Sequence, residues 1–345
     1  MTGGGLQQGA ASSIGMAMQN LVTVFGGSGF IGAQAVRQLA KAGWRIRVAV
    51  RNPGAAYAMR LHGDVGQIDI VQANVRNEAS LRRALSGATA AVNLVAVAYE
   101  TGRQGFQALH VMGAKNVATA ARAEGVSRLV QMSALGADAL SGSKYARTKA
   151  DGEEAARAIY PDAVVLRPSI VFGPEDNFFN RFAAMAQISP VLPLVGGGHT
   201  RFQPVFVGDV AKAIARAVAD PDCAGRTYEL GGPAEFSFRQ LMEMMLAEIG
   251  KRRILLPLPW PAASLAGAGG DLMLGLLGDS LIVPPVTADQ VTLLKADNVV
   301  SGAHLGLTDL GITPTTLEAV LPSYLYRYRK GGQYADQEDR EYAAV

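Results

Sequence analysis

The stretch LVTVFGGSGFIG, residues 21–32, joins an apolar, β-branched run to the spaced glycines Gly26, Gly29 and Gly32 and then to apolar residues at helical spacing. This order predicts a strand, a tight turn and a helix that begins near Phe30. Glycine has no Cβ, so a phosphate can approach its backbone closely. A helix that begins there directs unpaired N–H groups and its positive dipole end at that phosphate. The stretch therefore predicts a dinucleotide-binding turn, although plain strand-to-helix connections are also glycine-rich. The turn residues expected to hold the dinucleotide are Gly26, Ser28, Gly29, Phe30, Ile31 and Gly32.

The residue that follows the second predicted strand indicates which dinucleotide is bound. That strand lies in WRIRVAVRNP, residues 44–53, and an Asp or Glu normally follows it to bind the ribose hydroxyls of NAD. Here the position holds Arg51, and no acidic residue occurs between Ala33 and Gly63. A carboxylate would repel a 2′-phosphate, whereas a guanidinium binds it with two parallel hydrogen bonds. The sequence therefore predicts NADPH, although a solvated basic surface would equally explain Arg37 and Lys41.

Composition sets the limits for size, partners and compartment. The chain has 345 residues, of which 49% are hydrophobic and 18% charged, enough for one large domain and a smaller companion. Its net charge is only +3, which predicts no general affinity for nucleic acid. The single cysteine, Cys223, excludes an internal disulfide and has no neighbouring ligand cluster, so we expect a reducing compartment and no metal site.

Strand and helix patterns alternate after the glycine turn. Strands are predicted near 44–50, 67–71, 89–95, 127–132 and 163–167. Such alternation predicts an α/β fold, namely a Rossmann-type doubly wound parallel sheet. Ligands of these sheets lie across the carboxyl ends of the strands. The candidate residues at those ends are Arg51, Asn74, Ala96, Ser133, Pro168 and Ser169. Asn74 fits both an adenine contact and a turn.

We predict four segments along the chain. Residues 1–19 contain no Lys or Arg, which is unlike a secretory or transit signal, and are expected to form a flexible leader on a protein made where it works. Residues 20–250 form the nucleotide-binding domain, with 171–204 contributing to the smaller domain. Residues 251–325 form that smaller, mixed C-terminal domain, and 326–345 form a charged, extended tail.

Asp209 directly precedes an apolar periodic run, which predicts that it is a helix N-cap.

The apolar region 254–294 contains no Lys or Arg. Prolines 257, 259 and 261 and the aspartates Asp271 and Asp279 interrupt it, so it does not predict a membrane-spanning helix. Two interpretations stay open: a buried helical hairpin of the smaller domain, or a surface that docks onto a membrane protein or a bilayer edge.

Three side chains could form a proton-transfer group. Tyr145 and Lys149 are four residues apart in a helical pattern, which places them on one face. Ser133 ends the strand before that helix. Lysine's charge would lower the pKa of the phenol, so that Tyr145 could exchange a proton with a substrate oxygen to which Ser133 donates a hydrogen bond. Lys149 could also hold the nicotinamide ribose.

These motifs resemble the extended or atypical branch of the short-chain dehydrogenase/reductase superfamily. The similarity spans roughly residues 20–250 and includes GGSGFIG, the serine after the fifth strand, the YxxxK pair, LRPSIVFGP and PVFVGDVAKAI. Within the superfamily the chain looks most like the nucleotide-binding accessory subunits of respiratory complex I, the proton-pumping NADH:quinone oxidoreductase. The segments that carry this second similarity are SKYARTKADGEEAAR, RPSIVFGPEDNFFNRFA, GGGHTRFQPVFVGDVAKAI and the apolar region beyond 254, together with Arg51.

The resemblance implies a structural NADPH remote from electron transfer, with the C-terminal domain against the membrane arm near quinone entry. It also implies other complex I subunits as partners, lipid or quinone nearby, and a peripheral position on the cytoplasmic face of a bacterial inner membrane, or on the matrix side in mitochondria. The chain departs from active enzymes where His110 replaces a helix-four Asn and where ALGAD follows Ser133. We favour the accessory subunit without turnover. The alternative is a free NADPH-dependent reductase or epimerase that uses Tyr145 and Lys149.

Overall fold

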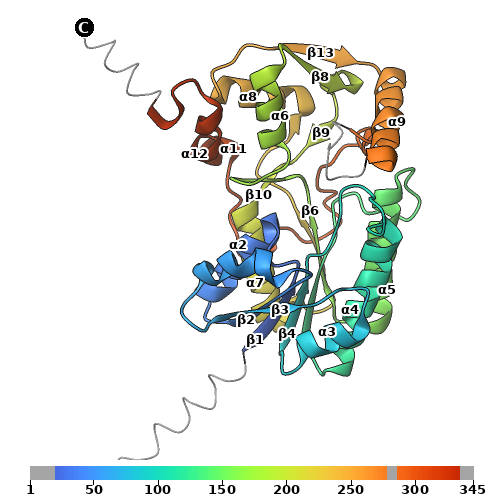
Figure 1. The fold of residues 1–345 in the computed structure, drawn as a ribbon, viewed down its shortest axis with the longest axis vertical. Helices are drawn as coiled ribbons and strands as arrows, with labels where there is room; N and C mark the ends of the chain where they lie inside the picture. The colour runs from blue at the N-terminus through green and yellow to red at the C-terminus, as the bar shows by residue number, and fades with distance from the viewer. Residues whose placement is uncertain (1–19, 278–285, 335–345) are drawn as a thin grey trace, which may run out of the picture.

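A seven-stranded sheet occupies the centre of the larger part of the molecule (Figure 1), as a computed structural model of residues 20–277 and 286–334 shows. The strand order is β11-β6-β5-β4-β1-β2-β3, and all neighbours are parallel. The strands are β1 (Leu21–Phe25), β2 (Arg45–Val50), β3 (Ile68–Gln72), β4 (Ala90–Asn93), β5 (Arg128–Met132), β6 (Val164–Pro168) and β11 (Thr227–Leu230). The predicted doubly wound α/β fold and its strands are thereby confirmed.

Helices cover both faces of this sheet (Figure 1). They are α2 (Phe30–Lys41), α3 (Glu78–Leu85), α4 (Met112–Ala123), α5 (Lys144–Ile159) and α7 (Val207–Ala219). Helices α2 and α7 pack on one face, while α3, α4 and α5 cover the other. Val22, Val24 and Val48 are fully buried beneath the first pair. The strand order reverses between β1 and β4, which makes their carboxyl ends the expected ligand crevice.

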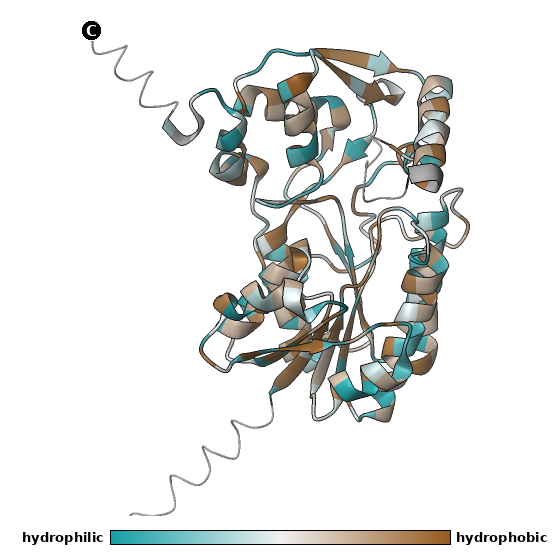
Figure 2. Ribbon diagram, in the orientation of Figure 1, coloured by the Kyte–Doolittle hydropathy of each residue, from teal (hydrophilic) through white to brown (hydrophobic). Residues whose placement is uncertain are grey.

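The smaller part of the molecule lies beyond those carboxyl ends and mixes short strands with helices (Figure 1). Its elements are β7 (Val171–Phe172), α6 (Phe179–Ile188), β8 (Val191–Val195), β9 (Arg201–Phe202), β10 (Val205–Phe206), β12 (Phe236–Ser237), α8 (Phe238–Glu248), β13 (Ile254–Leu258), α9 (Trp260–Leu277), α10 (Ala288–Leu293), α11 (Leu317–Val320) and α12 (Pro322–Leu325). Aromatic rings form much of its core, where Phe178 contacts Phe179, Phe182, Phe202 and Phe238. Figure 2 shows that the strands of the large sheet are mostly apolar.

Short helical turns connect these elements. They are η1 (Pro53–His62), η2 (Gln107–Val111), η3 (Gly196–Gly198), η4 (Pro221–Cys223), η5 (Thr308–Leu310), η6 (Tyr326–Tyr328) and η7 (Gly332–Tyr334). The last two lie in the predicted extended tail, so that prediction is wrong for residues 326–334, which include two 3₁₀ turns. The rest of the tail, 335–345, and the predicted leader, 1–19, lie outside the described residues.

Asp209 is not a helix cap, contrary to the sequence-based prediction. Helix α7 begins two residues earlier, at Val207, so Asp209 lies in its first turn. Its fully buried carboxylate accepts hydrogen bonds from the backbone N–H of Thr315 at 2.7 Å and from Lys212 Nζ at 2.8 Å. The helix starts earlier because Phe206 ends strand β10 directly before it. The hydrogen bond from Thr315 to Asp209 therefore holds the C-terminal segment around Thr315 against α7 of the nucleotide-binding part.

The apolar region 254–294 is not a buried helical hairpin. It begins as strand β13, which pairs with β8, and continues as α9, which packs on α10. Residues 278–285 of the region lie outside the described part. Large apolar side chains of β13 and α9 face solvent, with exposed fractions of 64% for Ile254, 77% for Leu265 and 64% for Leu272. Within the described residues, no helix is long and apolar enough to cross a membrane.

Candidate nucleotide-binding site

The glycine turn between β1 and α2 has a backbone that only glycine fits. Gly26 has a φ of +77°, and its N–H donates to the carbonyl of Ala49 at 3.2 Å. A Cβ on Gly32 would lie 2.3 Å from the carbonyl oxygen of Gly26. Helix α2 begins at Phe30 with Gly29 as its N-cap, and no side chain caps it. The first N–H groups of α2 are therefore free to bind an anion.

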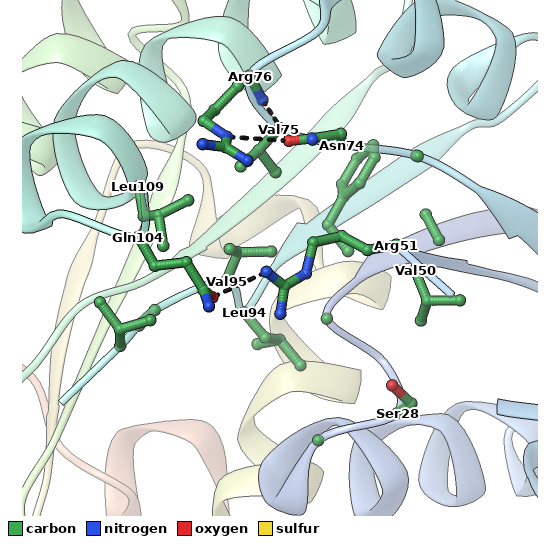
Figure 3. Close-up of a pocket in the computed structure, with 17 residues that line it drawn as sticks. Ser28, Val50, Arg51, Asn74, Val75, Arg76, Leu94, Val95, Gln104 and Leu109 are labelled. Atoms are coloured by element: carbon green, nitrogen blue, oxygen red, sulfur yellow. Dashed lines mark hydrogen bonds between the residues drawn. The ribbon is translucent and has the colours of Figure 1, made fainter. Parts of the chain in front are cut away.

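A cavity of about 280 Å³ lies next to this turn, over the carboxyl ends of the first four strands (Figure 3). Six of the sequence-predicted residues line it: Gly26, Ser28, Gly29, Arg51, Asn74 and Ala96. Phe30, Ile31 and Gly32 belong to the first turn of α2 and do not line it. Its floor is apolar, because Phe25, Val50, Val75, Leu94 and Leu109 also contribute. The shape and lining fit an adenine ring and ribose, with the phosphates at the glycine turn.

Arg51 lies exposed at the rim of this cavity, as the sequence predicts for a residue directly after β2. Its Nη1 donates to the side-chain oxygen of Gln104 at 2.8 Å (Figure 3). Gln104 comes from the loop after β4 and also lines the cavity. Sequence reasoning missed it because 53 residues separate the pair and no motif marks the loop.

Asn74 and Arg76 follow β3 on the other side of the cavity (Figure 3). The side-chain oxygen of Asn74 accepts from the backbone N–H of Arg76 at 3.1 Å, which is the turn interpretation of this residue. Arg76, which the sequence analysis did not single out, donates from Nη1 to the carbonyl of Arg103 at 3.0 Å. Two guanidinium groups therefore stand at the rim, and both contact the loop that carries Gln104.

Ser133, Tyr145 and Lys149 come together at the end of β5, next to the same crevice. Lys149 Nζ donates to the carbonyl of Met132 at 3.3 Å and lies 5.9 Å from the centroid of the Tyr145 ring. Ser133 is buried, and its hydroxyl has no hydrogen-bond partner among the described residues. A buried hydroxyl without a partner is costly, so this site fits a ligand that carries polar groups, such as a nicotinamide nucleotide.

The pKa values of the Tyr145 and Lys149 side chains differ from the sequence-based expectation. Burial raises the pKa of Tyr145 to about 12, so the prediction that Lys149 would lower it is wrong. Burial also lowers the pKa of Lys149 to about 8, against a smaller opposing effect of Glu153. Both shifts have the same cause, since burial disfavours the charged form of each group. At neutral pH Tyr145 is therefore a protonated hydrogen-bond donor and not an activated base.

His110 occupies the position where active relatives were expected to carry Asn. It lies in η2, a π-helical turn, where its Nε2 accepts from the backbone N–H of Val97 at 3.2 Å. Its Nδ1 lies 3.1 Å from the hydroxyl of Thr148, and its ring packs edge-on against Tyr145. Burial lowers the pKa of His110 to about 3, so the ring is neutral at physiological pH. His110 therefore packs against Tyr145 with both ring nitrogens already engaged.

Pro168 and Ser169 lie at the end of β6, away from the cavity at the glycine turn. The carbonyl of Pro168 accepts from the N–H of Leu135 at 2.9 Å. The hydroxyl of Ser169 contacts the side-chain oxygen of Asn298 at 2.7 Å. These contacts connect the crevice to the segment that follows α10. Neither residue lines the cavity over the first four strands.

Replacing Lys149 by Met should stabilise the nucleotide-free protein and weaken nucleotide binding. Lowering the lysine pKa from 10.5 to about 8 corresponds to a cost of about 3 kcal/mol for holding the ammonium in the fold. That cost is fully present below pH 8 and disappears as the pH approaches 10.5, because the unfolded chain binds the extra proton in that window. Met keeps the volume without the charge, so we expect up to this gain at pH 7, measured by urea unfolding.

The gain from Lys149→Met should shrink steadily between pH 8 and pH 10.5. The Kd for NADPH should rise about tenfold or more, because a charged hydrogen-bond donor is lost. A loss of stability at pH 7 would contradict the assignment of Lys149 as a buried amine. Lys115→Met, on α4, is the matched control and should change neither quantity.

Comparisons with known proteins agree with this geometry. The model of the NAD dependent epimerase/dehydratase family matches residues 22–231. NADH dehydrogenase (ubiquinone) 1 alpha subcomplex subunit 9, mitochondrial, of Arabidopsis thaliana is 36% identical over 316 residues, which cover 90% of this chain and 79% of that protein. The Mus musculus protein of the same name is 34% identical over 90% of this chain and 80% of its own length.

A solved structure shares the fold at lower identity. The crystal structure of the NADPH-dependent quinone oxidoreductase QOR2 from Escherichia coli, complexed with NADPH, superposes with a TM-score of 0.68 at 23% identity. The match covers 88% of this chain and 98% of that one. It shows that both the central sheet and the smaller part have counterparts in a single known fold.

Proposed function

The chain belongs to the NAD dependent epimerase/dehydratase family and, within it, to the mitochondrial-type subunit 9 relatives of NADH dehydrogenase (ubiquinone), and on that premise we propose that it is a nucleotide-binding accessory subunit of respiratory complex I. Its partners are then other subunits of NADH:quinone oxidoreductase. We further propose that the nucleotide is NADPH and that it is held for stability and assembly without turnover. The chain would lie peripherally on the cytoplasmic or matrix side of the membrane, with lipid or quinone nearby.

The choice of NADPH rests on Arg51. This guanidinium lies exposed at the ribose end of the cavity, where a carboxylate would be required to favour NAD. A 2′-phosphate can replace the neutral oxygen of Gln104 as its partner and adds a charge-assisted, two-pronged contact. The glycine turn would hold the pyrophosphate, and Tyr145 and Lys149 would hold the nicotinamide ribose. When bound, the nicotinamide could in principle supply a hydride.

The observation that carries the accessory-subunit proposal is the exposed apolar surface of β13 and α9. Isolated enzymes rarely expose several large aliphatic side chains on one segment, whereas docked subunits do. Ile254, Leu256 and Leu265 are each at least half exposed. The region between residues 254 and 294 contains no Lys or Arg. We propose that this surface lies against the membrane arm of the complex.

One purification tests the whole proposal. Native membranes carrying a tagged chain are solubilised in a mild detergent, and the assembly is analysed for its subunits and for its acid-released nucleotide. We expect complex I subunits together with NADPH, at one molecule per chain, that survives washing. The chain recovered alone, with nucleotide that exchanges freely, would contradict the proposal. NAD released in place of NADPH would contradict only the assignment of Arg51.

A second candidate function is favoured by the buried hydroxyl of Ser133, which has no hydrogen-bond partner among the described residues and follows Met132, the residue whose carbonyl accepts from Lys149. In a free reductase, that hydroxyl and the protonated phenol would both donate to a substrate carbonyl oxygen while the nucleotide supplies hydride. Tyr145→Phe should then abolish substrate-dependent NADPH oxidation, by more than about a hundredfold, while the nucleotide still binds. The measurement is NADPH absorbance with quinones and long-chain ketones. If the unsubstituted protein shows no such oxidation, this second function is wrong.

A further inference from the structure

Asp289 joins the apolar helices to the helix that carries Tyr145 and Lys149. Its carboxylate accepts hydrogen bonds from the backbone N–H of Lys144 at 2.6 Å and of Tyr145 at 3.1 Å. It also accepts from the hydroxyl of Ser143, the N-cap of α5, at 2.8 Å. The two backbone N–H groups are donors that a helix leaves unsatisfied at its N-terminus, where negative charge is also favourable. Asp289 thus completes the cap of α5 from 144 residues away in the sequence.

The position of Asp289 is fixed from its own side by α10 and α9. Thr287 and Gln290 form a reciprocal capping box at the start of α10, which orients the first turn where Asp289 lies. The two helices are in close contact, because a Cβ on Gly267 of α9 would lie 2.8 Å from Ala288. Asp271 of α9 accepts from the N–H of Ala288 at 3.2 Å. A displacement of α9 would therefore move Asp289.

A second series of contacts leads from the same end of α5 to Arg51. Lys144 Nζ donates to Glu100 Oε2 at 2.6 Å, and Glu100 Oε1 accepts from the N–H of Phe106 at 2.8 Å. These bonds close the loop that presents Gln104 to Arg51 at the cavity rim. The first turn of α5 is therefore connected to both ends of the nucleotide site: to the adenosine end through this loop, and to the nicotinamide end through Tyr145 itself.

We propose that Asp289 is a positioning residue that couples nucleotide occupancy to the apolar surface formed by β13 and α9. The proposal rests on the proposed function, since it requires that the crevice bind NADPH. Bound nucleotide fixes α5 and the Gln104 loop, which fixes Asp289 and, through α10, the placement of α9. The coupling is reciprocal: docking of the membrane arm on α9 must tighten nucleotide binding by the same free energy. This coupling would let the complex retain NADPH only in correctly docked subunits.

The experiment compares the full-length chain with Asp289→Ala and with Asp289→Asn, which keeps one acceptor oxygen without the charge. The first measurement is the dissociation rate of NADPH, followed by its fluorescence after displacement with excess NADP⁺. The second is hydrogen exchange of residues 260–277 and 286–293 with and without NADPH. Glu318→Ala is the matched control, because Glu318 also lies in the first turn of a short helix, α11, far from α5.

We expect NADPH to slow exchange in α9 and α10 of the unsubstituted chain, and this protection to disappear in Asp289→Ala. Dissociation should accelerate about tenfold in Asp289→Ala and less in Asp289→Asn, within the range usual for coupled sites. Nucleotide that binds without altering exchange in α9 would overturn the coupling and leave the proposed function intact. A chain that binds no NADPH would overturn both. Should Asp289→Ala fail to fold, the unsubstituted chain and Asp289→Asn still decide the outcome.

Discussion

Replacing Gly32 by alanine is expected to abolish nucleotide binding and to destabilise the nucleotide-free protein. The added Cβ would lie 2.3 Å from the carbonyl oxygen of Gly26 and 2.7 Å from backbone atoms of Gly27. Both neighbours are backbone atoms, so no side-chain rotation relieves the contact and the turn itself must shift. Overpacking of this kind typically costs about 1–3 kcal/mol. Urea unfolding measures the loss of stability, and calorimetric titration with NADPH should give no detectable binding.

Two other glycines serve as controls for Gly32→Ala. Gly269 lies in the interior of α9 with open space around it, so Gly269→Ala should leave binding unchanged and raise stability by up to about 1 kcal/mol, the opposite of Gly32→Ala. A Cβ added at Gly29 would lie 3.4 Å from the carbonyl oxygen of Gly26, which is an ordinary van der Waals contact. Gly29→Ala should therefore fold normally and still bind NADPH more weakly, because its Cβ would stand where a phosphate approaches the start of α2. Full binding by Gly32→Ala would mean that the nucleotide does not use this turn.

The sheet could be predicted from the sequence because its signals are local. A strand buried on both faces reads as a continuous apolar run, and the order of strand, glycine turn and helix is contained in residues 21–41. Arg51 and Asn74 could be placed at the ligand crevice for the same reason, since Arg51 directly follows β2 and Asn74 lies two residues after the end of β3. Even the pairing of Tyr145 with Lys149 on α5 requires only the helical period.

The features that the sequence did not reveal depend on contacts between distant segments. Gln104 reaches Arg51 from a loop without a motif, and Asp289 reaches α5 from the apolar region, at a position that no motif marks. The shift in the pKa of Tyr145 was predicted with the wrong sign because burial, which no spacing reveals, raises it. The N-cap of α7 was placed three residues too late, at Asp209 and not at Phe206, because a short strand ends directly before this helix.

Reversing the charge of Arg51 should reverse the nucleotide preference. In Arg51→Glu, a carboxylate would stand at the exposed end of β2, where it repels a 2′-phosphate and can accept hydrogen bonds from the ribose hydroxyls of NADH. Losing a charge-assisted contact costs about 1.5–3 kcal/mol, and the repulsion adds to it, so the Kd for NADPH should rise about a hundredfold or more. NADH should bind more tightly than before. Titration of both nucleotides, followed by tryptophan fluorescence, measures the change.

The control for Arg51→Glu must separate a specific contact from the general basic character of this surface. Lys41→Glu makes the same change in charge at the exposed end of α2, outside the cavity lining. A screened surface effect would weaken NADPH binding similarly in both variants and would fade with added salt. A direct contact with the 2′-phosphate would appear only in Arg51→Glu and would leave the ratio of NADPH to NADH affinity unchanged in Lys41→Glu. An unchanged ratio in both variants would show that Arg51 serves the Gln104 loop and not the phosphate.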